Sequence, residues 1–154
     1  MNINFRSSTL NDLEEICNLN NALFKLEKTH YDETLITDWP LTTEGQAYFK
    51  DMILHHYVQV AVLNDHIIGY LASSINEKGP YENIQYGEIN NMYILEEYQG
   101  QKIGTKLIAN FKKYLKDNNI SSLKVTASYK NIKVINFYKR NGLAEFNIEL
   151  TQNF

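Results

Sequence analysis

The chain has 154 residues, of which 44% are hydrophobic and 21% charged, and its net charge is −3. This length suits one domain with a sizeable core, so we expect a single domain over residues 1–154. The negative charge argues against nucleic acid as the main partner, because phosphate binding needs a basic surface. No apolar run approaches the roughly 18 residues of a membrane span, so no membrane association is expected.

The single cysteine, Cys17, excludes an internal disulfide, and residues 1–6 lack the apolar core of a signal peptide. A cytoplasmic location is therefore expected. Cys17 lies on an apolar stripe of helical spacing with no base nearby in the sequence, which favours a core residue over a nucleophile.

The first half of the chain alternates strand and helix patterns. Ile3 and Phe5 alternate with polar residues and predict a strand. Thr9 or Asn11 can then cap an amphipathic helix. A second helix is expected to start near Thr43. Residues 57–63 and 66–72 predict a β-hairpin that turns at Asn64-Asp65.

The second half centres on residues 88–115. An apolar strand runs into a glycine-bearing turn over residues 99–105 and then into a helix of apolar period 3.6. A strand over 123–128, a helix from Asn131 to Gly142 and a last strand over 145–150 follow. The strands on either side of the central helix should be parallel neighbours.

The glycine-bearing turn is a candidate phosphate site. It leaves the first N–H groups of the helix unpaired at the positive end of the helix dipole, which suits a diphosphate. Gly100 and Gly104 could instead serve only a tight turn and a close helix–strand contact. The P-loop is excluded because three residues, not four, separate these glycines, and the dinucleotide fingerprint does not fit.

Two motifs resemble those of the GNAT superfamily of N-acyltransferases. Gln99 and Gly104 match its acyl-CoA motif, in which Arg or Gln is followed by two residues, Gly, one residue, and Gly or Ala. Lys102 replaces the first motif glycine, so the backbone there is either an ordinary right-handed turn or a strained one. The second motif, Asn-x-x-Ala-x-x-Phe/Leu-Tyr-x-x-x-Gly-Phe, is matched by Asn131, Phe137, Tyr138 and Gly142. The two motifs have the family's order and spacing.

The resemblance implies an α/β fold of the α+β type, with a mixed, mostly antiparallel twisted sheet and helices on both faces. Acetyl-CoA as cosubstrate would lie between two central strands that splay apart just after residue 94. The residues implied to bind it are Met92, Tyr93, Ile94, Gln99, Gly100, Gln101, Lys102, Ile103, Gly104, Thr105, Asn131 and Tyr138.

Amide formation needs a base to free the amine's lone pair, a donor for the thioester oxygen and an acid for the thiolate. By resemblance, Tyr138 is the acid. Polyamine-type relatives carry a glutamate at the position of Asn90, an amide that cannot accept a proton. Glu88 lies two residues earlier, on the same strand face by alternation, and is the first candidate base. His30 or a loop carboxylate is an alternative, and so is a plain surface role for Glu88.

The irregular segment over residues 25–45 is where such families build the acceptor site. Its carboxylates and aromatic rings, together with Asn90, suit an amine. The residues expected there are Glu27, Tyr31, Asp32, Glu33 and Trp39, and the alternative is a solvated loop with Trp39 in the core. The chain's histidines do not cluster with Cys, Asp or Glu at ligand spacing, so no metal is expected.

The leading hypothesis is transfer of an acetyl group from acetyl-CoA to a primary amine of a small molecule or peptide by direct attack. The alternative is a non-catalytic domain that binds or senses acyl-CoA, which Asn90 and Lys102 favour. A homodimer is usual in such families, although nothing in the sequence marks an interface.

Overall fold

The computed structural model describes every residue from Met1 to Phe154 and contains one five-stranded sheet in the order β1-β2-β3-β4-β5. The strands are β1 (Asn4–Ser7), β2 (Tyr57–Leu63), β3 (His66–Ile75), β4 (Tyr86–Ile94) and β5 (Ser122–Val125). The first four pair antiparallel, and β5 alone runs parallel to its neighbour β4.

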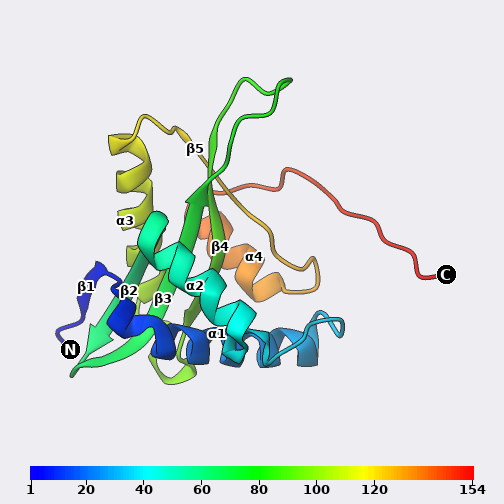
Figure 1. The fold of residues 1–154 in the computed structure, drawn as a ribbon. Helices are drawn as coiled ribbons and strands as arrows, with labels where there is room; N and C mark the ends of the chain where they lie inside the picture. The colour runs from blue at the N-terminus through cyan, green and yellow to red at the C-terminus, as the bar shows by residue number, and fades with distance from the viewer.

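Two helices cover each face of this sheet (Figure 1). The helices are α1 (Leu13–His30), α2 (Thr43–His55), α3 (Ile103–Asp117) and α4 (Ile132–Arg140). One core cluster joins α1 and α2 to the sheet and includes Phe49 and Tyr70. The other joins α3 and α4 to the opposite face and includes Phe111 and Tyr138. The predicted fold class is therefore confirmed. None of the helices combines the length and apolar composition that a membrane crossing requires.

Backbone conformations and a capping hydrogen bond explain where three of the turns and helix ends lie. Asn64 and Asp65 both take positive φ, 50° and 64°, as the tight turn between β2 and β3 requires. Thr42 caps α2 by accepting a hydrogen bond from the Gly45 N–H. Gly142 takes a φ of 91° just after α4, the left-handed ending expected of it.

The predicted last strand over residues 145–150 is wrong. This segment pairs with no strand, and it is almost fully exposed, with Phe146 at 79% and both Ile148 and Leu150 at 89%. The alternating pattern is present, but a strand forms only beside another strand, and β5 remains the edge of the sheet. The strand predicted over 123–128 is also shorter, since β5 ends at Val125.

A buried ion pair fixes the entry to α1. The side-chain oxygens of Asp12 accept hydrogen bonds from the Arg6 guanidinium at 2.7 and 2.9 Å, and one of them accepts from the Thr9 N–H at 2.7 Å. Asp12 is only 5% exposed. The Arg6 hydrogen bonds, followed by that of Thr9, hold the pKa of Asp12 below its ordinary value.

We predict that Asp12→Asn lowers the free energy of unfolding by about 1–3 kcal/mol, because charged hydrogen bonds in a buried setting are lost. The wild-type stabilisation is complete above the unfolded-state pKa of about 3.9 and is lost as the pH falls through the lower native value. Urea unfolding between pH 2 and 7 measures it. Asp117→Asn, which removes an exposed partner of Lys113, is the matched control and should change stability by less than about 0.5 kcal/mol.

Candidate functional site

The cleft at the centre of the sheet forms because β4 and β5 stop pairing early. Their last paired residues are Ile89 and Val125, whereas β4 continues to Ile94. The expectation that the strands part after residue 94 is thus wrong by five positions. The register between β3 and β4 skips Asn90, which is a bulge. A bulge increases local twist, and this bends β4 away from β5 where the two separate.

The parted stretch of β4 leaves backbone groups facing the gap. The Leu95 N–H bonds to the Ile68 carbonyl at 2.9 Å, toward β3. Backbone groups of successive residues in an antiparallel pair point to opposite sides, so those of Met92 and Ile94 point away from β3 toward the gap. These groups can pair with an extended polar chain, and an N–H among them can polarise a carbonyl.

The turn before α3 presents an open helix N-terminus. Gly100 and Lys102 take φ values of 77° and 64°, so Lys102 is left-handed rather than right-handed. The first hydrogen bond back into the helix runs from the Lys106 N–H to the Lys102 carbonyl, and no side chain caps this end. The N–H groups of residues 103–105 therefore lack helical acceptors and suit an anion.

Gly104 also permits a close helix–strand contact, which was the alternative to a role in phosphate binding. A Cβ at this position would lie 2.9 Å from the Phe137 ring and 3.3 Å from the Ile94 side chain. The start of α3 is thereby packed directly against α4 and the end of β4.

Polar side chains tie the same three elements together. The Gln99 amide donates to the Ile94 carbonyl at 2.9 Å and its oxygen accepts from Lys133 at 3.2 Å. Asn131 uses its oxygen to cap α4, accepting from the Val134 N–H at 3.1 Å, which leaves its amide N–H groups as donors. Gln101 and Thr105 are exposed along the same turn, and Ile103 is buried beneath it.

Tyr138 lies on α4 and is 8% exposed. Burial raises the pKa of its phenol, and the charge of Glu27 raises it further. The hydroxyl therefore stays protonated at neutral pH, as a proton donor must. Tyr138 packs in the cluster on the α3–α4 face, while Glu27 belongs to α1 on the other face. The effect of Glu27 on Tyr138 from the other face of the sheet fits the gap that opens where β4 and β5 part.

Glu27 is half-buried near the end of α1. Burial raises the pKa of its carboxyl, and the neighbouring charge of Asp32 adds to the effect. The same carboxylate contributes to the raised pKa of the Tyr70 phenol, whose main cause is complete burial. The charge of Glu27 therefore raises the pKa of both phenols, that of Tyr70 and that of Tyr138.

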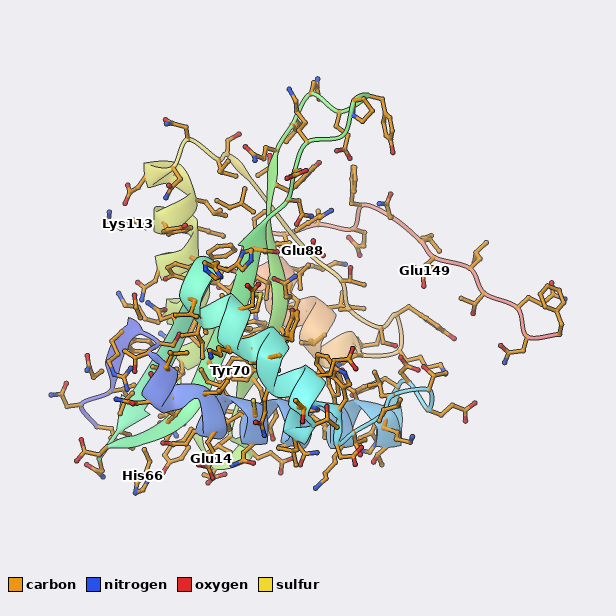
Figure 2. All side chains as sticks on the ribbon, viewed as in Figure 1. Glu14, His66, Tyr70, Glu88, Lys113 and Glu149 are labelled. Atoms are coloured by element: carbon orange, nitrogen blue, oxygen red, sulfur yellow. The ribbon has the colours of Figure 1, made fainter.

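Glu88 lies elsewhere. It pairs with Ser74 of β3, four residues along that strand from Tyr70, or roughly 13 Å at 3.3 Å per residue (Figure 2). Its carboxylate accepts from the Asn76 amide at 2.6 Å and lies 4.0 Å from the Lys124 ammonium. The bulge at Asn90 interrupts the regular alternation on which the expected shared face of Glu88 and Asn90 was based.

The loop residues predicted to bind the acceptor lie in different surroundings. Asp32 is exposed and bonds to Thr34, whose hydroxyl and N–H lower the pKa of its carboxyl, with a smaller contribution from Lys130. Lys130 precedes α4, so the charge of that loop reaches Asp32. Trp39 packs on Tyr48 with ring centroids 5.5 Å apart, at the edge of the core. Tyr31 is half-buried, and His30, Glu33 and Asn90 are exposed.

Sequence reasoning missed buried polar atoms on the α1 side. The Oδ1 atoms of Asn20 and Asn91 are buried without a hydrogen-bond partner, and the Asn20 amide donates to the Tyr70 hydroxyl at 2.9 Å. Asn20 within the apolar stripe of α1 was the available signal, because a buried amide needs a polar partner. No three His, Cys, Asp or Glu side chains come together as a metal site.

Comparison with known proteins agrees with this geometry. The acetyltransferase (GNAT) family model matches residues 13–143. The chain is 28% identical over 152 residues to an alpha-tubulin N-acetyltransferase of Plasmodium falciparum, covering 90% of this chain and 78% of that protein. It is 27% identical over 98 residues to an uncharacterized N-acetyltransferase of Archaeoglobus fulgidus, covering 62% of this chain and 67% of that protein.

A solved structure supports the same fold. A predicted acetyltransferase from Clostridium acetobutylicum, crystallised with acetyl-CoA, superposes with a TM-score of 0.78 at 22% identity, covering 99% of this chain and 96% of that one. This likeness shows the fold of the chain. The chain belongs to the acetyltransferase (GNAT) family.

Lys102 offers a test of the helix N-terminus. We predict that Lys102→Gly raises the free energy of unfolding by about 1 kcal/mol, because glycine adopts the left-handed conformation without strain. The same change should weaken CoA binding about two- to five-fold at low salt, through loss of one exposed cation worth about 0.4–1 kcal/mol.

Urea unfolding and calorimetric titration with CoA measure the two effects. Lys113→Gln removes an equal charge from an exposed position later in α3 and is the matched control. A loss of stability in Lys102→Gly, or an affinity for CoA equal to that of the control, would contradict the assignment.

Proposed function

We propose that this protein is an N-acetyltransferase that moves the acetyl group of acetyl-CoA to a primary amine by direct attack. The observation that carries the proposal is the juxtaposition of an uncapped helix N-terminus, a parted pair of strands and a buried phenol. A diphosphate, an extended amide arm and a thiol leaving group need these three features in turn.

Acetyl-CoA binding follows from the backbone. The N–H groups at the start of α3, within the turn from Gln99 to Thr105, would hold the diphosphate. The backbone groups of Met92 and the N–H of Ile94 would pair with the pantetheine amides, whereas the Ile94 carbonyl is already bonded by Gln99. An N–H there would stabilise the oxyanion. Asn131 has unused amide donors for the same arm. Tyr93 would contribute only as part of β4, because its side chain packs in the core on the α1–α2 face.

Glu27 is a better candidate than Glu88 for the proton acceptor. An ammonium group must lose a proton before its nitrogen can attack the thioester. A carboxyl of raised pKa is a stronger base than an ordinary one, and Glu27 lies close enough to Tyr138 to affect its ionisation. Glu88 is already engaged by Asn76 and Lys124.

The proposed reaction is balanced at each atom. A proton passes from the ammonium to Glu27, directly or through one water. The amine nitrogen forms a bond to the acetyl carbon while the C–S bond breaks. The departing thiolate takes the phenol proton of Tyr138. The second proton that the nitrogen loses as it becomes an amide passes to the Tyr138 phenolate, directly or through water, and the proton on Glu27 goes to solvent.

The acceptor is proposed to be a primary amine of a small molecule or a peptide. Glu27, Tyr31, Asp32 and Trp39, with Asn90 across the cleft, would supply anionic and aromatic contacts to a cation. One relative is named for alpha-tubulin. A structural neighbour, an aminoglycoside acetyltransferase from an uncultured soil metagenomic sample in complex with sisomicin, has a TM-score of 0.74 at 19% identity. The cytoplasmic location remains a prediction.

Thiol release separates catalysis from mere acyl-CoA sensing. Protein and acetyl-CoA are mixed with a panel of polyamines, aminoglycosides and lysine peptides, and free CoA is measured with a thiol reagent. We expect release above the hydrolysis background with at least one amine class. Acetyl-CoA binding with no release for any amine would favour the sensing domain.

Tyr138→Phe tests the acid. Because positioned acids contribute about 10²–10⁴-fold, we expect turnover to fall at least about ten-fold while the affinity for acetyl-CoA stays within about two-fold. Tyr114→Phe, on α3 and in contact with Tyr57, is a matched control with unchanged turnover expected. An unaltered rate in Tyr138→Phe would remove this phenol from the mechanism.

Glu27→Gln and Glu88→Gln form a matched pair for the base. Since burial and Asp32 raise the pKa of Glu27, the wild-type rate should fall as pH decreases through a value above the ordinary glutamate pKa of about 4.3. Glu27→Gln should lower kcat/KM about 10²-fold or more and abolish this acid limb. Glu88→Gln should keep the fall of the rate at low pH. If Glu88→Gln instead abolished that fall and Glu27→Gln kept it, Glu88 would be the base.

A further inference from the structure

Two buried amide oxygens on the α1 side of the sheet have no hydrogen-bond partner. They are the Oδ1 atoms of Asn20 on α1 and Asn91 on β4. Asn20 is completely buried, and Asn91 is half-buried with this oxygen out of contact with solvent. Because burying a carbonyl oxygen away from any donor destabilises a fold, such atoms are rare and point to a function for the groups that carry them.

The Tyr70 hydroxyl, between the sheet and α1, adds a hydrogen-bond donor to these two acceptors (Figure 2). It accepts a hydrogen bond from the Asn20 amide at 2.9 Å, but its own proton is not used in any hydrogen bond of the chain. Tyr70 is completely buried, and burial raises the pKa of its phenol, so the proton stays on the oxygen at neutral pH.

The register between β3 and β4 brings these groups together. Tyr70 pairs with Tyr93, and Ala72 pairs with Asn91. Tyr70 and Asn91 are therefore diagonal neighbours, which lie roughly 7–8 Å apart in a strand pair. Tyr70, Ala72 and Tyr93 belong to the core cluster on the α1–α2 face, and alternation puts Asn91 on that face too. Asn20, Tyr70 and Asn91 thus form an inner polar cluster with two open acceptors and one open donor.

The inner polar cluster borders the place where the acetyl group would be transferred. Asn91 directly precedes Met92, whose backbone groups face the gap between β4 and β5. Glu27, the proposed proton acceptor, lies two helical turns after Asn20 on the same side of α1, roughly 10 Å along the helix. Burial raises the pKa of the Tyr70 phenol, and the charge of Glu27 adds to the effect, so the carboxylate acts on the cluster.

The cluster consists of neutral groups, and this determines what it can bind. Amide oxygens accept hydrogen bonds and take no proton, whereas the phenol can donate its hydrogen. A hydroxyl group complements both, because it donates to an amide oxygen and accepts from a phenol. An ammonium group has no lone pair for the phenol and is costly to bury among neutral groups. An alkyl group would leave the oxygens unpaired.

We propose that the inner polar cluster is a specificity site that binds a hydroxyl group of the acceptor molecule, a few bonds away from the amine that is acetylated. This inference rests on the proposed acetyl transfer and names the acceptor class as amino alcohols, in preference to alkylamines and diamines. Asn91 accepts from the hydroxyl and Tyr70 donates to it. The Asn20 amide holds the Tyr70 hydroxyl in place, and its oxygen accepts from a second hydroxyl where the acceptor has one.

Binding to the CoA-loaded protein tests the site without any need for turnover. The probes are amino alcohols of two to five carbons. Each is matched with the alkylamine that has a methyl group in place of the hydroxyl and with the diamine that has an amino group there. Protein labelled with ¹⁵N is titrated with each compound, and the asparagine side-chain signals are followed by NMR.

We expect at least one amino alcohol to bind about ten-fold or more tightly than both matched amines and to shift the Asn91 side-chain signals. Affinities within about two-fold at every chain length, or tighter binding of the alkylamine or the diamine, would overturn the proposal. Binding as expected without acetyl transfer to any amine would contradict the proposed function and leave the specificity site in place.

Asn91→Leu and Asn110→Leu form a matched pair of variants. Asn91→Leu should reduce the affinity for the amino alcohol to that for the matched alkylamine. Asn110 lies on α3, where its amide donates to Gln59 at 3.2 Å, and Asn110→Leu should leave the affinity unchanged. Tyr70→Phe removes the donor and should also narrow the ratio between the two affinities, a ratio that does not depend on the folded fraction.

Thermal unfolding distinguishes a binding role of Asn91 from a structural one. Because its oxygen has no partner to lose, Asn91→Leu should keep or raise Tm. Asn110→Leu breaks a hydrogen bond and should lower Tm by about 2–4 °C. A lower Tm in Asn91→Leu together with an unchanged preference for the amino alcohol would show a structural role and overturn the proposal.

Discussion

The early end of the pairing between β4 and β5 is the constraint on which the candidate site depends. Two adjacent parallel strands normally satisfy each other's backbone groups along their shared length. Here β5 stops at Val125 and the bulge at Asn90 turns β4 aside, so the last residues of β4 have no strand partner on that side, and only the Ile94 carbonyl is bonded there, by the Gln99 amide. Although α1 and α4 lie on opposite faces of the sheet, the charge of Glu27 on α1 raises the pKa of the Tyr138 phenol on α4.

The second requirement is a fixed distance between the start of α3 and Tyr138. Gly104 brings the start of α3 into contact with Phe137, the residue before Tyr138, and a side chain at 104 would collide with that ring. Gln99 adds polar links to β4 and to α4. A bound diphosphate at the start of α3 and a thioester beside Tyr138 would thus be held at a fixed separation, as direct transfer requires.

Local signals in the sequence were sufficient for most of the fold. Asn64-Asp65 and Gly142 specify a turn and a helix end through their own backbone preferences, and both act as predicted. The bulge at Asn90 could not be predicted in this way, because it depends on the register between β3 and β4. The proximity of Glu27 to Tyr138 joins segments far apart in the chain and depends on where the strands part. The strand predicted over 145–150 does not form, because a strand needs a neighbouring strand and alternation of side chains alone does not supply one.

Calorimetric titration with CoA and, separately, with pantetheine tests the central claim most directly, because pantetheine retains the thiol arm but lacks the diphosphate. Because the N-terminus of α3 is open, we expect CoA to bind at least about ten-fold more tightly than pantetheine, a difference of about 1.4 kcal/mol in binding free energy. High salt should reduce this difference. Equal affinities for the two compounds, or no binding of CoA at all, would contradict the account.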